Sequence, residues 1–350
     1  MTTTMEYKPI KFPQDESKHD TIGEWWYFNG NLTDKDGRQY SYMNTLFRAT
    51  IPFQNAGVLS KIPKNNFYFY HSIITDIDQN KFFPNIDYLV RITNDSFKKE
   101  GLNVHYSPVV LGKNSQHYCM QQTNKNQYIV EGKDINLQMT AKKPPLLENQ
   151  IGYVNFFNRP TYYYSLTDLV TEGTIVIDKK MIEVTGKSWM DHQWSDVFDV
   201  NKDSWNWFYV QLETNIEIVC YEFIHMGKSA YLATIIYPDA TQKSFSKVLI
   251  KPLERKWKSP TTKTVYDLDW EIEIPEADIK LTIESKVENH EMNFLHINYW
   301  ESPTKIEALI KGNKVKGFGY MELAGRPSIF NDLTFLKSKI LERVPALRLK

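Results

Sequence analysis

The side chains best suited to chemistry lie mid-chain, in the stretch Gly186-Lys187-Ser188-Trp189-Met190-Asp191-His192-Gln193-Trp194. In a β-strand, successive side chains point to opposite faces. One face then carries Ser188, Met190, His192 and Trp194, and the other carries Trp189, Asp191 and Gln193. His192 and Trp194 are therefore expected as neighbours on one wall. A core histidine bonded to a backbone carbonyl is the alternative role for His192, and Asp191 could anchor a loop or pair with an arginine.

Glu222 is a second unusual position. In a strand through this region it shares a face with three apolar side chains, those of Ile216, Ile218 and Cys220. A carboxylate in such surroundings is costly unless it is paired or protonated. Glu222 is therefore a candidate proton donor.

An internal echo indicates the elements that position these residues. Trp25-Trp26-Tyr27-Phe28 is matched 180 residues later by Trp205-Asn206-Trp207-Phe208, and the central Gly186-x-x-Trp-Met-Asp191 is matched by Gly317-x-Gly-Tyr-Met-Glu322. Two copies are too few for a solenoid but fit a duplicated domain. We predict one domain at residues 1–195 and a second at 196–350.

The periodicity indicates an almost entirely β protein. Tyr266 to Ile274 alternates apolar and acidic residues, and Ile279 to Ile283 repeats the apolar alternation after a turn at 275–278, which predicts an antiparallel hairpin with a solvated acidic face. One helix is predicted near the C-terminus, where Leu333, Leu336, Ile340 and Val344 follow helical spacing before Pro345. Residues 142–169, rich in Pro and Tyr, suit either a lid or a plain connection. Units of this kind hide their sheet edges by closing into barrels or by forming two-sheet sandwiches.

Composition narrows the choice of partners. The 42 basic and 42 acidic residues cancel, which argues against nucleic acid or an anionic membrane as partner. Two cysteines and eight histidines without close-spaced ligand pairs suggest no metal site, and the chain has no phosphate-binding glycine loop, so we expect no cofactor. There is no signal-like or membrane-spanning run, which predicts a cytoplasmic protein. The 21 Tyr and 9 Trp are enough rings to line a cavity for a hydrophobic small molecule. The sequence leaves the oligomeric state open.

Three motifs together carry a family resemblance. They are Glu24-Trp25-Trp26-Tyr27-Phe28 with Arg48, the central Gly186-x-x-Trp-Met-Asp-His-x-Trp194, and Gly317-x-Gly-Tyr-Met-Glu322. In this order and spacing the chain resembles the carotenoid 1,2-hydratase and AttH family of lipocalin-like proteins, from about His19 to Gly325. The resemblance implies an all-β fold of two tandem lipocalin-like (calycin) antiparallel β-barrels, to which we add the C-terminal helix. It also implies hydration or cyclisation of apolar isoprenoid or polyketide-type molecules. Other members resemble pericyclases, a flavonoid hydratase or proteins with no assigned activity.

The resemblance also suggests site residues. The His-x-Trp pair is implicated in the hydratases, so His192 and Trp194 are the first catalytic candidates. The carotenoid hydratases place an Asp two positions after a Tyr, whereas this chain has Tyr221-Glu222-Phe223. Either Glu222 replaces that acid, with Tyr221 beside it as a further catalytic candidate, or the carotenoid reaction is absent. The side chains expected to contact the ligand are Trp26, Tyr42, Asn44, Tyr164, Trp189, Trp205 and Trp207. Glu24 and Arg48 are expected to form a buried ion pair.

The expected chemistry follows from what addition to an alkene needs. Protonating carbon takes an acid that stays protonated near neutral pH, which burial of a carboxyl group provides. Aromatic faces stabilise the resulting cation by roughly 0.5–2 kcal/mol per contact. Two alternatives remain: a pericyclase that works by shape and hydrogen bonding, and a carrier of hydrophobic ligands without chemistry.

Overall fold

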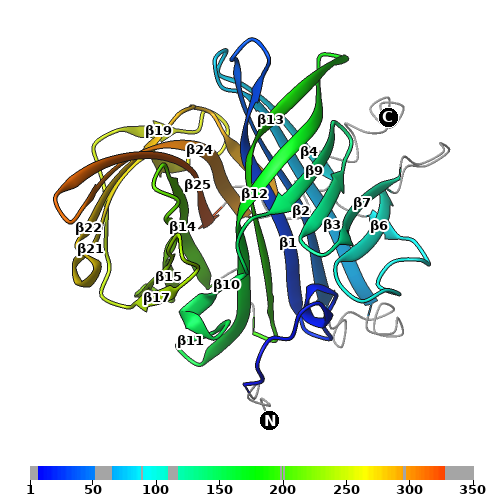
Figure 1. The fold of residues 1–350 in the computed structure, drawn as a ribbon, viewed down its shortest axis with the longest axis horizontal. Helices are drawn as coiled ribbons and strands as arrows, with labels where there is room; N and C mark the ends of the chain where they lie inside the picture. The colour runs from blue at the N-terminus through cyan, green and yellow to red at the C-terminus, as the bar shows by residue number, and fades with distance from the viewer. Residues whose placement is uncertain are drawn as a thin grey trace, which may run out of the picture.

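The computed structural model describes residues 7–51, 65–87, 90–108, 117–197, 199, 202–294 and 297–327. About two thirds of these residues lie in antiparallel strands, with no α-helix among them. A nearly closed barrel and a half-barrel lie side by side, the barrel in blue to green and the half-barrel in yellow to orange (Figure 1). The helix predicted from Leu333 to Val344 lies outside the described residues.

The barrel is one antiparallel sheet of thirteen strands with the order β4-β3-β2-β1-β13-β12-β9-β8-β7-β6-β5, while β10 and β11 also pair with β12. Its strands are β1 (Gly23–Asp34), β2 (Gln39–Ile51), β3 (Asn65–Asp76), β4 (Lys81–Asp87), β5 (Val90–Ile92), β6 (Asn103–Pro108), β7 (Tyr118–Asn124), β8 (Gln127–Glu131), β9 (Ile135–Ala141), β10 (Leu146–Leu147), β11 (Tyr153–Phe156), β12 (Arg159–Ile177) and β13 (Lys180–Ser195). Strand β5 lies against β3, which brings the two ends of the sheet together. Inward-facing aromatic and aliphatic side chains fill the barrel.

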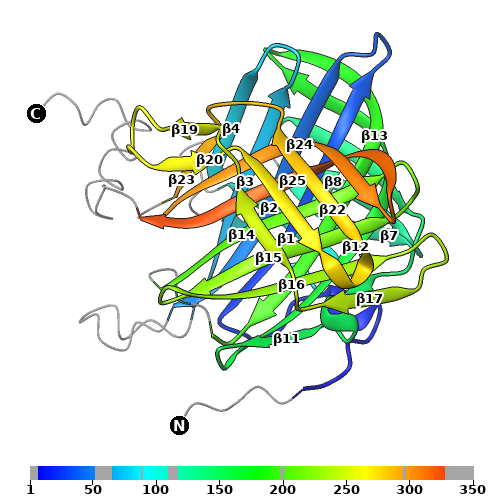
Figure 2. The same ribbon diagram turned by 90° about the vertical axis from the view of Figure 1, so that its left-hand side faces the viewer.

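The half-barrel is a ten-stranded sheet with the order β17-β16-β15-β14-β25-β24-β22-β21-β18, with β23 paired to β24. Its strands are β14 (Asp203–Leu212), β15 (Glu217–His225), β16 (Lys228–Ile236), β17 (Gln242–Phe245), β18 (Leu249–Pro252), β21 (Asp269–Ile274), β22 (Ile279–Ser285), β23 (Glu291–Phe294), β24 (Ile297–Ile310) and β25 (Asn313–Pro327). A two-stranded sheet is formed by β19 (Lys256–Lys258) and β20 (Val265–Asp267). Figure 2 shows these strands in front of the barrel.

The predicted hairpin is present. Strands β21 and β22 pair with Ile274 opposite Ile279, around the 3₁₀ turn η4 (Pro275–Ala277) and a left-handed Asp278. The acidic face is partly exposed to solvent, since the side chains of Glu271 and Glu273 are 28 % and 35 % exposed; they lie 2.7 and 3.1 Å from Lys280. The other 3₁₀ turns are η1 (Gln14–Glu16) and η3 (Glu148–Gln150).

The internal echo is reproduced in strand pairing. In the barrel β1 pairs with β13 and β2, and in the half-barrel β14 pairs with β25 and β15. Even the register is repeated, because Phe28 lies opposite Met190 and Phe208 lies opposite Met321. The chain passes from one sheet to the other between Ser195 and Asp203, and a boundary at residue 195 remains our proposal.

A third apolar cluster joins the two sheets, and we call it the interface layer. Its buried members are Tyr27, Met43, Ile73, Leu146, Val154, Tyr163 and Trp189 from the barrel and Trp207, Tyr209, Val219, Tyr221, Leu232, Ile236, Met292, Tyr299, Tyr320 and Ala324 from the half-barrel. Trp25, Phe156, Trp205 and Phe223 are partly buried against it. The outer face of the barrel is therefore shielded from solvent where the half-barrel covers it. Across the described part of the chain, none of the helical segments has the length or apolar character needed to cross a bilayer.

Candidate functional site

His192 and Trp194 face the inside of the barrel. On β13 the alternation places Met190, His192 and Trp194 inward, and Trp189 and Asp191 outward into the interface layer. Trp26 of β1 lies directly opposite His192, and their rings are stacked with centroids 4.9 Å apart. The predicted division of faces is therefore correct, and the sheet of the barrel separates two distinct polar clusters.

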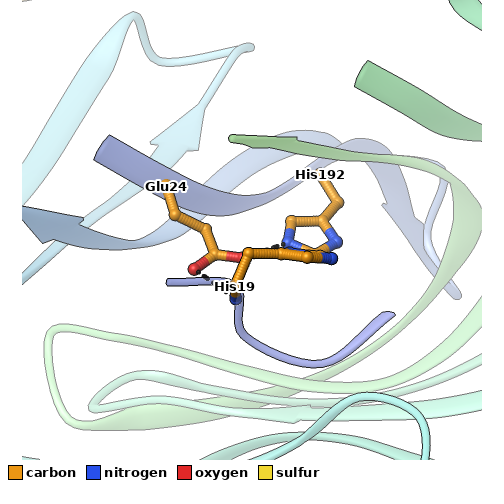
Figure 3. Close-up of side chains that lie close together, drawn as sticks. All are labelled: His19, Glu24 and His192. Atoms are coloured by element: carbon orange, nitrogen blue, oxygen red, sulfur yellow. Dashed lines mark hydrogen bonds and ion pairs between the residues drawn. The ribbon is translucent and has the colours of Figure 1, made fainter. Parts of the chain in front are cut away.

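The first of these, which we call the barrel-end cluster, consists of Glu24 and its partners Arg48, His19 and His192. This buried carboxylate accepts Arg48 Nε at 2.9 Å, which confirms the expected ion pair. It also contacts His19 Nδ1 at 2.8 Å and His192 Nε2 at 3.0 Å (Figure 3). Burial opposes ionisation of Glu24, but the hydrogen bonds from the two histidines outweigh it and lower its pKa to about 2. Burial lowers the pKa of His192 to about 4, so its ring is neutral at pH 7.

These three residues have the types and spacing of metal ligands. The candidate ligand atoms of His19, Glu24 and His192 all lie within 4.8 Å of one another. However, both oxygens of Glu24 already accept the backbone N–H of His19 at 3.1 Å, in addition to the side chain of Arg48 and the two rings. A carboxylate with its acceptor positions filled in this way, next to a guanidinium, fits a hydrogen-bonded anchor better than a cation site.

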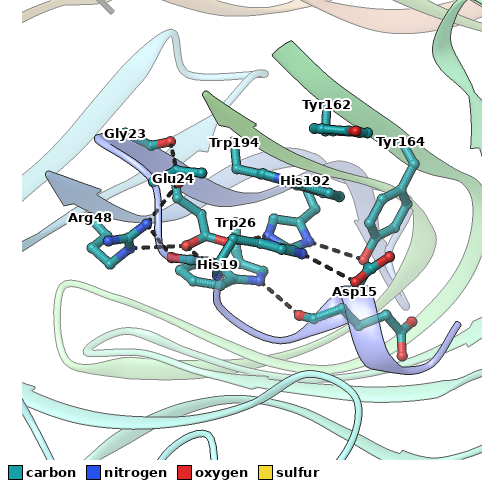
Figure 4. A network of polar contacts seen from close by, with 12 residues as sticks. Asp15, His19, Gly23, Glu24, Trp26, Arg48, Tyr162, Tyr164, His192 and Trp194 are labelled. Atoms are coloured by element: carbon teal, nitrogen blue, oxygen red, sulfur yellow. Dashed lines mark hydrogen bonds and ion pairs between the residues drawn. The ribbon is translucent and has the colours of Figure 1, made fainter. Parts of the chain in front are cut away.

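The barrel-end cluster holds the N-terminal segment, residues 7–22, across the end of the barrel (Figure 4). The ring of His19 stacks on Trp194 with centroids 3.8 Å apart, and Trp26 Nε1 donates to the Glu16 carbonyl at 3.1 Å. The Glu16 carboxyl group accepts a hydrogen bond from Tyr128 Oη at 2.6 Å, and burial raises the pKa of Glu16 to about 7. His192 and Trp194 are thus covered by the chain's own N-terminal segment.

The second polar cluster lies in the interface layer, around Asp191. This side chain is 4 % exposed and accepts three hydrogen bonds, from Ser165 Oγ at 2.6 Å, Trp189 Nε1 at 2.7 Å and Tyr163 Oη at 2.9 Å. It has no ion pair with an arginine within the described residues. Burial raises its pKa to about 7, against the opposing effect of these donors. Asp191 therefore exchanges a proton in the range where an enzyme's general acid works.

The half-barrel contributes carboxyl groups at the equivalent place. Asp191 lies opposite Tyr27 on β1, and Glu322 lies opposite Trp207 on β14. Both acids accept an indole N–H at 2.7 Å, Asp191 from Trp189 and Glu322 from Trp205. Burial raises the pKa of Glu322 to about 7 as well. The two copies of the echoed motif thus place two weak acids in one layer.

Hydrogen bonds cross the interface layer in both directions. Tyr27 Oη on the barrel donates to Glu301 on β24 at 2.8 Å, and Trp207 Nε1 donates to Tyr163 Oη on the barrel at 2.8 Å. The rings of Trp189 and Tyr209 stack across it with centroids 4.6 Å apart. The acids are therefore positioned by both sheets together.

Residues 142–169 are not a plain loop: they contain short strands and a turn, and they hold a fourth acid. Short strands β10 and β11 and the turn η3 pack against the half-barrel, where Leu147 N–H donates to Gln242 at 2.9 Å. Glu148 is fully buried and accepts Thr234 Oγ1 at 3.1 Å, and burial raises its pKa well above the usual value.

The structure does not bring the four predicted catalytic side chains together. His192 and Trp194 lie inside the barrel, Tyr221 lies in the interface layer, and Glu222 lies on the opposite face of β15 from Tyr221. Glu222 is half-buried and accepts Ser229, Asn206 and Tyr231 at 2.6, 2.8 and 3.0 Å, so it is partnered there.

The predicted ligand contacts divide in the same way. Trp26, Tyr42, Asn44 and Tyr164 are buried inside the barrel, while Trp189, Trp207 and the half-buried Trp205 belong to the interface layer or its edge. Sequence reasoning missed Glu148, Tyr163, Glu301 and the acid role of Asp191 and Glu322. For two of these residues the sequence did contain a signal, because the two echoed motifs both end in an acidic residue, Asp191 and Glu322.

Solved structures of other proteins share this architecture. The structure of a putative AttH from Nitrosomonas europaea is similar, with a TM-score of 0.75, 22 % identity and coverage of 93 % of this chain and 100 % of that one. Kievitone hydratase from Nectria haematococca has a TM-score of 0.69 and 16 % identity, covering 90 % and 93 %. CghA with Sch210972 has a TM-score of 0.51 and 10 % identity, covering 86 % and 88 %. At these identities the likeness concerns the fold, and it is lipocalin-like, as predicted.

Two further comparisons address the family. A search of curated proteins found no match. The model of the AttH-like family matches residues 3–326, nearly the whole chain, in agreement with the resemblance carried by the three motifs. The chain therefore belongs to the AttH-like family.

Proposed function

We propose that this protein is an enzyme of the hydratase or cyclase type, which protonates a carbon–carbon double bond of an apolar isoprenoid or polyketide-type molecule in the interface layer. Asp191 is the acid. The observation that carries this proposal is a carboxyl group with a pKa of about 7, enclosed by aromatic rings from both sheets and without a cationic partner among the described residues. The similarity in fold to kievitone hydratase supports the reaction class.

The layer has both components that the reaction needs. Protonation of an alkene produces a carbocation, and the π-faces of Trp207, Tyr163 and Tyr221 stabilise such a cation by roughly 0.5–2 kcal/mol per contact. Tyr163 donates to Asp191 and stabilises the carboxylate that remains after proton transfer. Partly buried rings of Trp25, Trp205, Phe156 and Phe223 border the layer and suit an apolar substrate approaching from solvent.

The barrel-end cluster has a positioning role in this proposal. Glu24 is ionised and His192 is neutral at pH 7, so neither is a proton donor to carbon under those conditions. His192 fixes the position of β13 from the inside of the barrel through its contact with Glu24. This also fixes Asp191, which is the preceding residue on the same strand and points outward into the interface layer. Glu222 lies outside the layer and has no part in the chemistry.

The test compares Asp191→Asn with Glu222→Gln, which neutralises a half-buried carboxyl group on the other face of β15. A panel of isoprenoid alkenes, together with kievitone, is incubated with each protein in water enriched in heavy oxygen, and products are read by mass spectrometry. We expect Asp191→Asn to lose turnover by at least ~100-fold with ligand binding retained, and Glu222→Gln to remain active. Full turnover in Asp191→Asn would overturn the acid mechanism. A pericyclase would show that result but would respond to Trp207→Ala, and a carrier would return every ligand unaltered.

A further inference from the structure

Glu301 and Glu322 are paired in the half-barrel. They are direct cross-strand partners on β24 and β25, and they are hydrogen-bonded to each other. Glu301 is 1 % exposed, and Glu322 is half-buried. Neither takes part in an ion pair with a basic residue in the part of the chain that the structure describes. Two like charges in this position repel strongly, so the pair holds a proton.

The surroundings show where that proton lies. Tyr27 Oη of β1 donates to Glu301 Oε2 at 2.8 Å, and Trp205 Nε1 of β14 donates to Glu322 Oε1 at 2.7 Å. Asp191 of β13 interacts electrostatically with Glu322, and Tyr320 of β25 interacts with both acids. The buried His290 lies against the backbone of the pair, with its Nδ1 2.9 Å from the Glu301 carbonyl oxygen. Burial raises the pKa of Glu301 well above its usual value, and the hydrogen bond between the two acids raises the pKa of Glu301 and lowers that of Glu322, so we place the proton on Glu301, which donates it to the Glu322 carboxylate.

Two buried polar side chains on the strands that contact the pair have no partner among the described residues. Asn29 is fully buried, and neither Nδ2 nor Oδ1 of its side chain has a partner within the described residues. It follows Tyr27 on the same face of β1. The hydroxyl of Tyr320, also fully buried, has no partner there either. Strands β1 and β25 meet at this point, where Asn31 Nδ2 donates to the Gly319 carbonyl at 3.4 Å. Buried polar groups are nearly always hydrogen-bonded. The unpartnered polar groups of Asn29 and Tyr320 therefore indicate that a small molecule with a hydroxyl group binds here.

We propose that Glu322, paired with Glu301, is the base of the addition reaction, and that Asn29 and Tyr320 bind the oxygen nucleophile beside it. This inference rests on the proposed function. Asp191 gives its proton to one alkene carbon, and the other carbon becomes cationic. The oxygen of a hydroxyl group forms the new C–O bond and loses its proton to the Glu322 carboxylate. Solvent at the half-buried Glu322 then removes that proton, and Asp191 is protonated again from water, so the cycle balances.

The hydroxyl group can come from water or from the substrate itself. Water gives a hydrated product, and a substrate hydroxyl gives a cyclic ether. The chemistry at Glu322 is the same in both cases. Heavy-oxygen water distinguishes them, because the label enters the product only when water is the nucleophile.

The first experiment needs no substrate. Infrared difference spectra are recorded across pH for the wild type, Glu301→Gln, Glu322→Gln and the control Glu222→Gln. We expect a protonated-carboxyl band at pH 7 that Glu301→Gln removes, that Glu322→Gln shifts by changing its hydrogen bond, and that Glu222→Gln leaves intact. Identical bands in all four proteins would overturn the shared proton.

The second experiment separates this inference from the proposed function. With a substrate found in the Asp191 test, we expect Glu322→Gln to lose product formation by ~100-fold or more while the substrate still exchanges deuterium from heavy water at the alkene carbon. Glu322→Asp should restore part of the activity, and circular dichroism and thermal unfolding confirm folding of each variant. Full product formation by a folded Glu322→Gln with Asp191→Asn inactive would overturn only the base. An active Asp191→Asn would overturn the proposed function itself.

Discussion

At the scale of single residues, the two ionisable clusters differ because their carboxyl groups have different neighbours. Glu24 is as deeply buried as Asp191, but the hydrogen bonds from His19 and His192 outweigh the effect of burial and lower its pKa to about 2. Asp191 faces neutral donors only, and desolvation raises its pKa to about 7. The same kind of side chain is an anchor at one position and a weak acid at the other.

The raised pKa of Asp191 predicts a specific dependence of stability on pH. Between its unfolded value of 3.8 and about 7, the folded state binds this proton more tightly, so the group's contribution to the free energy of unfolding falls as pH rises through that window. Asp191→Asn removes the effect. Relative to the wild type, the variant should gain up to about 4 kcal/mol between pH 4 and pH 8. Urea unfolding at several pH values measures this, and parallel stability curves for the two proteins would contradict it.

At the scale of elements, the glycines of the echoed motif allow the strands to pack closely. A Cβ atom on Gly186 of β13 would lie 2.1 Å from the carbonyl oxygen of Asn31 on β1. One on Gly317 of β25 would lie 2.5 Å from that of Gln211 on β14. The equivalent strands of both sheets thus need a glycine where the backbones approach. This pairing sets the register that brings Asp191 opposite Tyr27 and Glu322 opposite Trp207.

Gly186→Ala is therefore expected to destabilise the protein by more than about 2 kcal/mol, because backbone has to move to relieve the contact. Gly312→Ala is the matched control: this turn glycine has a φ of +80°, but a Cβ atom added there would meet no other atom within 4 Å, so its cost is about 1 kcal/mol. Chemical denaturation of both variants gives the comparison. Equal losses would mean that close packing at Gly186 is unimportant.

Much of this arrangement could be predicted from sequence, and the rest depended on packing between sheets. Alternation correctly separated His192 from Asp191, and the strands that carry the echoed motifs pair in equivalent ways in the two sheets. Sequence could not say which face of β13 would be covered by another sheet, because both faces carry aromatic side chains. The sequence pattern therefore favours Glu222, which has apolar neighbours on its strand, over Asp191 as the proton donor. Donors on the adjacent strands β14 and β16 satisfy Glu222, and only the pairing of those strands with β15 brings them within reach.

At the scale of the whole molecule, the interface layer makes each half depend on the other. Tyr27 of the barrel donates a hydrogen bond to Glu301 of the half-barrel, and Trp207 of the half-barrel donates one to Tyr163 of the barrel. Residues 1–195 alone would expose the apolar members of the layer together with Asp191 and Glu148. The two sheets therefore form one cooperative unit.

The cross-layer hydrogen bonds provide a test of that dependence. Tyr27→Phe leaves the buried Glu301 carboxyl without its hydroxyl donor and should cost about 1–3 kcal/mol in a single unfolding transition, followed by both tryptophan fluorescence and circular dichroism. Tyr237→Phe, at a half-buried tyrosine outside the layer, is the control and should cost less. Two separate transitions in the variant would show that the halves unfold independently.

The placement of the acids on opposite sheets has a stereochemical consequence. In the proposed reaction Asp191 acts from the barrel and Glu322 acts from the half-barrel, so a planar alkene between the two sheets would meet one carboxyl group on each of its faces. Hydrogen and oxygen then arrive on opposite sides of the former double bond, and the product carries them in an anti relationship. A relative that exchanged the duties of its two acids would make the mirror-related centre from the same molecule.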